Sequence, residues 1–280
     1  MTEGVTSELR PVDQAISSFP DSPRVLYEKN PLIEVTCQLH FPPILRIDSE
    51  VPAGFQEKIR NSFPFFSEEE GGFGLLDLPA ELLQLVKASI ASKVTRSARK
   101  FESEDKSWTV SLTRDFIALQ TRKYTRWEAF RDKLGNLIEV LEAEYRPSYF
   151  TRIGLRYQDL IVRSELGLNG VAWSELLQSH IAAEYSSPLS QAVIEANHRA
   201  LIALPSSQGY ANLQHGTAFR QNQKEEALYL IDADFFTEER TEIANALNRL
   251  DIFNREAGRL FRGCITERLH EAMQPSSLTP

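Results

Sequence analysis

Two arginines, a glutamine and a glutamate occupy alternate positions of segments whose pattern is typical of β-strands. Arg152, Arg156 and Gln158 share one face of a strand predicted over residues 149–162, and Glu34 lies on the polar face of the first predicted strand. Guanidinium groups match the geometry of phosphates and carboxylates, so this set predicts a small-anion site in which Glu34 pairs one arginine when no ligand is bound. The alternative is an antiparallel sheet that leaves one polar face to water.

A pair of aspartates forms a second candidate for chemistry. Asp232 and Asp234 stand two residues apart on a predicted strand, so their carboxylates point to the same face, about 7 Å apart. Two carboxylates so placed are candidate ligands for Mg²⁺ or Mn²⁺, or an acid and base pair. Leu228 and Leu230 share their face, so the alternative is a solvated strand end.

Charge is distributed unevenly along the chain. The protein has a net charge of −8, but residues 93–133 contain eleven Lys and Arg against six Asp and Glu. This excess predicts a basic surface that meets an acidic partner or ligand, and the alternative is a solvated face with local ion pairs. The residues predicted to form that surface are Arg96, Arg99, Lys100, Arg114, Arg122 and Lys123.

Composition excludes several classes of protein. The chain has 280 residues, 42% of them hydrophobic and 25% charged, which is typical of a folded globular protein and not of a disordered one. It contains no phosphate-binding glycine loop, serine-nucleophile elbow or paired-cysteine motif, and its two cysteines make no disulfide framework. No cofactor is expected. No apolar run approaches the roughly 20 residues of a membrane helix and no leader peptide is evident, so a cytoplasmic protein is expected.

Periodicity predicts two halves with the same order of elements. The first is expected to contain a strand over 31–41, helices over 53–61 and 79–92, strands over 94–103, 107–113 and 116–121, and a helix from a Thr125–Glu128 capping box to Pro147. The second is expected to contain a strand over 149–162, a helix over 173–184, strands over 191–204, 209–219 and 227–236, and a closing helix over 238–273.

This order predicts an α+β fold with a predominantly antiparallel sheet and long helices on one face. The order strand, helix, three strands, long helix occurs twice. Either an internal duplication or chance would explain this order. The expected organisation is a mobile tail over 1–24, α+β halves over 25–147 and 148–274, and a tail over 275–280.

Four segments carry a resemblance to a known family. They are Pro31–Val35, Trp127–Phe130, Arg152–Tyr157 and Ile231–Asp234. Together they resemble a sporadically distributed bacterial family of about this length whose function is uncharacterised. The resemblance implies a bacterial, cytoplasmic protein, and it supplies no catalytic residue.

Three functions fit these observations. The first is a non-enzymatic binding or interaction protein that recognises a protein partner or a small anion. The second is a metal-dependent, phosphate-handling enzyme that uses Asp232 and Asp234. The third is an RNA or single-strand binder with bases stacked on Tyr124 or Trp127, which the acidic net charge disfavours. No membrane partner is expected.

Overall fold

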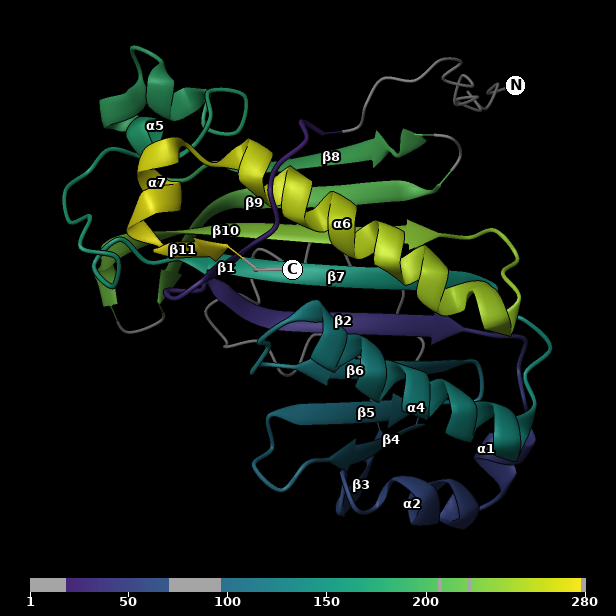
Figure 1. Ribbon diagram of the computed structural model, residues 1–280. Coiled ribbons are helices and arrows are strands. Elements are labelled where there is room, and N and C mark those ends of the chain that lie inside the picture. Colours follow the sequence, from purple (N-terminus) through teal and green to yellow (C-terminus); the bar gives the residue numbers. More distant parts are fainter. Residues whose placement is uncertain (1–18, 71–96, 206–207, 221–222, 278–280) are drawn as a thin grey trace, which may run out of the picture.

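A computed structural model describes residues 19–70, 97–205, 208–220 and 223–277. Nine strands of these residues form one antiparallel sheet (Figure 1). Their order across the sheet is β3 (Phe65–Glu70), β4 (Ser97–Glu102), β5 (Trp108–Leu112), β6 (Phe116–Thr121), β2 (Leu32–His40), β7 (Arg152–Ile161), β10 (Gln223–Thr237), β9 (Tyr210–Arg220) and β8 (Asn197–Ala203). The predicted α+β class with a large antiparallel sheet is confirmed.

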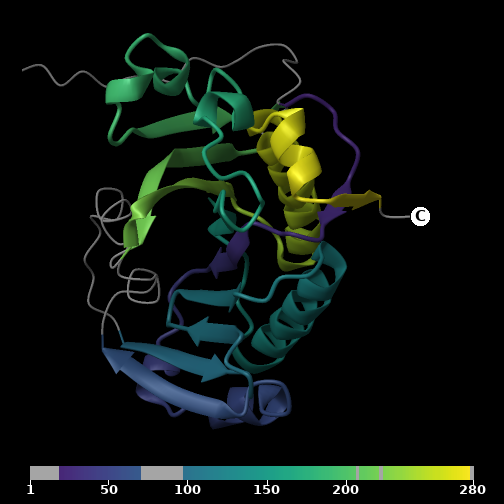
Figure 2. The same cartoon turned by 90° about the vertical axis from the view of Figure 1, so that its left-hand side faces the viewer.

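Two long helices cover one face of this sheet. They are α4 (Trp127–Tyr145) and α6 (Ala246–Cys264), and Figure 2 shows them on the same side. Val35, Cys37 and Leu39 of β2 are fully buried toward them, because alternate strand residues point to opposite faces. No helix among the described residues combines the length and apolar character that crossing a bilayer requires.

The order of strands is the same on both sides of the central β2–β7 pair. From β2 outward come β6, β5 and β4, and from β7 outward come β10, β9 and β8. In each half the first strand therefore pairs with the last strand of its own three-stranded meander, and a long helix follows. Strand β3 is an addition at the edge of the first half. A duplicated origin for this order stays a prediction.

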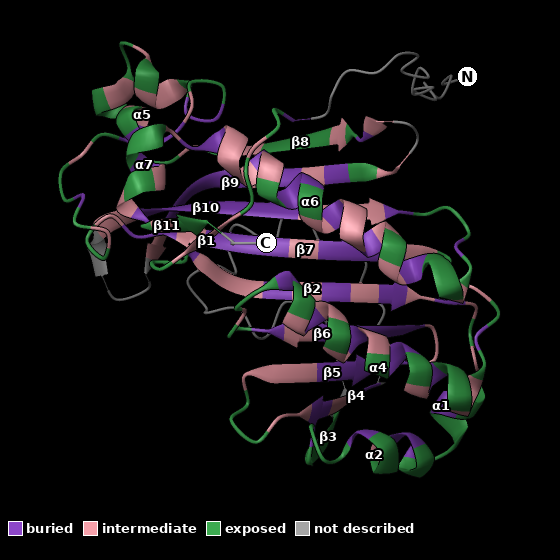
Figure 3. Ribbon diagram, in the orientation of Figure 1, coloured by how far each residue is buried: buried purple, intermediate pink, exposed green. Residues whose placement is uncertain are grey.

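Both halves contribute to one buried core. A single cluster of packed apolar side chains includes residues of both β2 and β7 and of both α4 and α6. The two helices are also joined by polar contacts, since Trp127 Nε1 donates to Asp251 Oδ1 over 2.7 Å and Arg131 Nε donates to the same oxygen over 2.9 Å. Figure 3 shows the buried residues concentrated in the central strands and on the sheet-facing sides of the helices. The predicted halves, 25–147 and 148–274, thus share a core.

The closing helix is broken, so the prediction of one helix over 238–273 is wrong. A 3₁₀ turn (Ile243–Asn245) leads into α6, which ends at Cys264, and α7 (Glu267–Ala272) begins after it. Between the two helices Ile265 is extended and forms a β-bridge with Leu177. This long-range pairing overrides local helix periodicity.

Other helices also differ from expectation. Helix α4 begins without a side-chain cap, and Glu128 of the predicted capping box pairs with Arg24 over 2.6 Å. The helix predicted over 173–184 is limited to α5 (Trp173–Leu176), and two 3₁₀ turns follow, at Glu184–Ser186 and Ser190–Ala192. Short helices α1 (Arg46–Ser49) and α2 (Ala53–Ile59) follow β2. The helix predicted over 79–92 lies outside the described residues.

Part of each predicted tail is ordered against the fold. Phe19 is buried, and Asp21 pairs with Arg259 of α6 over 2.5 Å. Strand β1 (Val25–Tyr27) pairs antiparallel with β11 (Pro275–Ser277). The predictions of tails over 1–24 and 275–280 are therefore wrong for residues 19–24 and 275–277, because these segments find partners far away in the sequence.

Candidate functional site

A ladder of polar side chains crosses the centre of the sheet on the face turned away from α4 and α6, which we call the polar face. The antiparallel register sets Thr36 of β2 opposite Arg156 of β7, and Arg156 opposite Asp234 of β10. Asn212 of β9 continues the same row beyond Asp234. The register therefore brings the predicted arginines and the predicted aspartates into one site.

The inner part of the ladder is an arginine clamped to a buried aspartate. Arg156 Nε donates to Asp232 Oδ1 over 2.7 Å, and its Nη2 donates to Oδ2. Gln158 Nε2 donates to that second oxygen over 3.2 Å, and the Asp232 side chain is only 4% exposed. Burial disfavours the Arg156 charge, but the nearby carboxylates of Asp232, Asp234 and Glu34 outweigh it and raise the pKa of Arg156.

The outer part of the ladder is a more open ion pair. Arg152 Nη2 lies 2.7 Å from Asp234 Oδ2, and both side chains are about a quarter exposed. The Arg152 guanidinium also lies 4.9 Å from the ring centroid of Phe236. A Cβ on Gly154 would clash with this guanidinium, so the glycine makes room for Arg152 and not for an external anion.

Glu34 does not pair with either ladder arginine, contrary to the prediction. Its carboxylate lies 3.4 Å from Arg122 Nε and accepts a hydrogen bond from Thr36 Oγ1 over 3.4 Å. The β2–β7 register shifts between Leu32 and Glu34, and the glutamate stands opposite Gln158. The alternation of residue types contains no sign of that shift.

The aspartate pair is arranged for guanidinium groups and not for a metal ion. Asp232 and Asp234 do share a face, as predicted, but each carboxylate is occupied by an arginine. Within the described ranges, no group of three or more His, Cys, Asp or Glu side chains is arranged to hold a metal. The metal role predicted for these aspartates thus finds no support in the geometry.

The predicted basic surface is largely compensated by nearby acids and carbonyls. Arg99 is buried, and its guanidinium donates to the carbonyls of Ile47 and Asp48, so its place in that surface is wrong. Arg114 lies 3.7 Å from the Asp48 carboxylate.

Two of the remaining residues of that predicted surface also have acidic partners. Arg122 pairs with Glu34, and Lys123 lies 3.5 Å from the Asp105 carboxylate. Lys100 stands on β4 opposite Ser111, and Arg96 lies outside the described residues. Ion pairs between neighbouring elements therefore account for much of the local excess of Lys and Arg.

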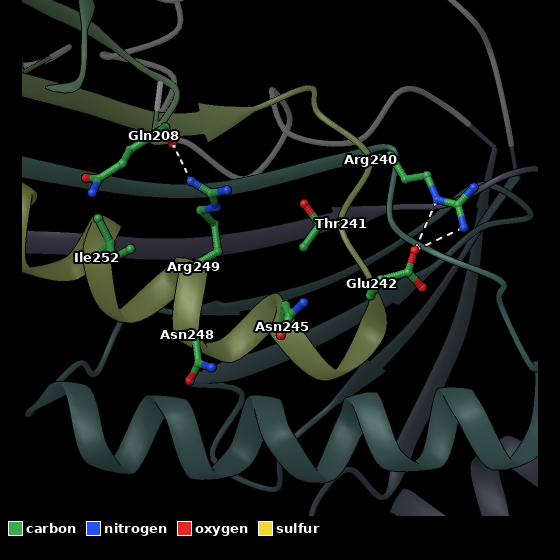
Figure 4. Close-up of a pocket in the computed structure, with 8 residues that line it drawn as sticks. All are labelled: Gln208, Arg240, Thr241, Glu242, Asn245, Asn248, Arg249 and Ile252. Atoms are coloured by element: carbon green, nitrogen blue, oxygen red, sulfur yellow. Dashed lines mark hydrogen bonds and ion pairs between the residues drawn. The ribbon is translucent and has the colours of Figure 1, made fainter. Parts of the chain in front are cut away.

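One hollow lies away from the ladder, where β10 leads into α6, and no motif in the sequence pointed to it. Figure 4 shows the side chains around this cavity of about 360 Å³. Arg249 Nη1 donates to the Gln208 carbonyl over 3.3 Å, whereas Arg240 pairs with Glu242 over 3.0 Å. Its lining residues are Gln208, Arg240, Thr241, Glu242, Asn245, Asn248, Arg249 and Ile252. We call this hollow the α6 pocket.

No protein-family model matches this chain, and no curated protein matches it. The resemblance to an uncharacterised bacterial family stays an expectation, and the function has to follow from the geometry of the site.

The helix side of β7 holds an unusual carboxyl group. Asp159 is 7% exposed, and no hydrogen bond or ion pair joins its carboxyl group to another described residue. Burial, together with the negative charge of Asp232, raises the pKa of Asp159 to about 8. The group is therefore mostly neutral in the folded protein at pH 7, and it stands behind the ladder, not in it.

Proposed function

We propose that this chain is a non-enzymatic binding protein that recognises a protein partner through the polar face of β2, β7 and β10. One observation carries the proposal. Guanidinium and carboxylate groups alternate there in a fixed ladder, and the side chains of Arg152, Arg156 and Asp234 are each about a quarter exposed. Such a face offers donors and acceptors in a set order, which suits charge-complementary recognition of another protein.

The ladder suits a protein better than a nucleic acid. Nucleic-acid surfaces are read by an excess of basic side chains, whereas positive and negative groups balance here and the chain has a net charge of −8. The two arginines of the ladder already bind the carboxylates of Asp232 and Asp234, so a small anion would have to displace one of these aspartates. We further propose that the protein acts in the bacterial cytoplasm, as the family resemblance implies.

Arg152→Ala tests this function, with Arg126→Ala as its control. Arg126 is exposed at the start of α4, on the helix side of the sheet. Proteins that co-purify with each tagged variant are compared, and direct binding of any candidate partner is then measured by calorimetry. We expect a partner that binds the parent and Arg126→Ala at least tenfold more tightly than Arg152→Ala. Equal binding by all three proteins would refute recognition through the polar face.

The α6 pocket favours a second candidate function, the binding of a small anion. Arg249 is half-buried, and its hydrogen bond there goes to a neutral carbonyl, so its charge has no carboxylate partner among the described residues. Calorimetric titration of phosphate and citrate tests this function. Arg249→Gln should abolish the binding heat, whereas Arg255→Gln, on the same helix but outside the pocket, should keep it. An absence of heat with the parent removes this candidate.

A further inference from the structure

Large apolar side chains exposed to solvent gather at the two ends of the sheet. At the β8 end, Ile194 is 83% exposed and Leu201 is 54% exposed. The full set of exposed large apolar residues among those described is Leu189, Ile194, Leu201 and Tyr210 near β8, and Leu45, Val51, Phe65 and Phe66 near β3. Exposed large apolar residues beside a sheet edge are candidates for a contact surface.

Strand β8 presents a free backbone edge. Among the described residues it pairs with β9 alone, so its outer N–H and C=O groups are open to another strand. Natural edges are usually protected by Lys, Pro, a bulge or an inward charge, because they otherwise pair with other chains. The β8 sequence contains no Lys or Pro, and Arg199 donates to Asn212 Oδ1 over 2.9 Å.

We infer that β8 pairs antiparallel with β8 of a second copy of this chain, around a two-fold axis at Ala200. That register sets Arg199 opposite Leu201 and His198 opposite Ile202, so no like charges face each other. A stable interface buries roughly 1,200 Å² or more, so the dimer is expected to cover exposed apolar residues outside the seven-residue strand, such as Ile194 just before β8.

Light scattering coupled to gel filtration tests the dimer at tens of micromolar protein. The parent is expected to have twice the monomer mass. The double variant Ile194→Lys/Leu201→Lys is expected to have the monomer mass, and its melting temperature should equal that of the parent. Val51→Lys is the control, since Val51 is 77% exposed at the other end of the sheet. A monomeric parent, a dimeric double variant, or a dimer lost only in Val51→Lys would overturn the inference.

A cross-link tests the register itself. Opposed Cα atoms in an antiparallel pair lie about 4.5–5.5 Å apart, within the reach of a disulfide. Ala200→Cys should therefore join two copies under mild oxidation, whereas Ala203→Cys, which would face Asn197, should not. The natural Cys37 and Cys264 are buried and do not compete. Equal cross-linking by both variants, or none by Ala200→Cys in a dimeric sample, would overturn pairing at this axis.

Discussion

Replacing Asp159 with asparagine should stabilise the protein at neutral pH. The folded state raises the pKa of this carboxyl from 3.8 to about 8. Between those values the unfolded chain ionises the group while the folded protein keeps it protonated, so stability falls as pH rises. Each pH unit of the interval costs about 1.4 kcal/mol. From 3.8 to 7 this amounts to about 4 kcal/mol, and Asp159→Asn removes the cost.

Urea unfolding from pH 5 to pH 9 measures this effect. The free energy of unfolding of Asp159→Asn should exceed that of the parent by about 1–2 kcal/mol at pH 5, and the difference should grow until about pH 8 and then level off. Asp132→Asn, an exposed substitution on α4, should follow the parent throughout. Parallel curves for the parent and Asp159→Asn would show that the buried carboxyl does not titrate as argued.

Three further substitutions probe the ladder and a neighbouring turn. Arg156→Ala should lower the free energy of unfolding by about 3 kcal/mol, because it leaves the buried Asp232 carboxylate without its ion-pair partner. A double-mutant cycle with Asp232→Ala should show coupling between the two residues, and additive effects would contradict the ion pair. Gly154→Ala should push the Arg152 guanidinium aside at a cost below about 1 kcal/mol, and a crystal structure with Arg152 unmoved would disprove the clash. Gly209→Ala should cost about 2–3 kcal/mol in urea unfolding, because φ is +122° and its Cβ would meet a backbone carbonyl of β10; parent-like stability would refute this.

Local pattern was sufficient to predict eight of the nine strands of the large sheet and their order along the chain, but it missed β3 and the β1–β11 pair. Period-two alternation marked β2 and β7 close to their observed bounds, and it also put Arg152 and Arg156 on one face. Pairs of neighbouring strands followed from short turns. These are properties of adjacent residues, so a single sequence contains them.

The partners of the site residues depended on contacts between distant segments. Arg156 meets Asp232 only because β10 lies beside β7, 76 positions later in the chain. Arg99 is buried because α1, about 50 positions earlier, places its carbonyls over β4. Neither neighbour is visible in local periodicity. Arg156 was therefore predicted to clamp an anion with Glu34 as its partner, and Arg99 to lie on a basic surface, whereas oxygen atoms of other segments bind both.

The β1–β11 pair has a consequence for how this chain could be encoded. Val25 stands opposite Ser277, so the first and last strands of the described residues meet in one antiparallel ribbon. A short hairpin turn could join them, and a new opening near Pro147 would separate the halves at the connection between α4 and β7. The rearranged gene would then encode the second half of the chain before the first. Because the new opening lies between α4 and β7 and cuts no strand, such a circular permutant would keep every strand neighbour of the original.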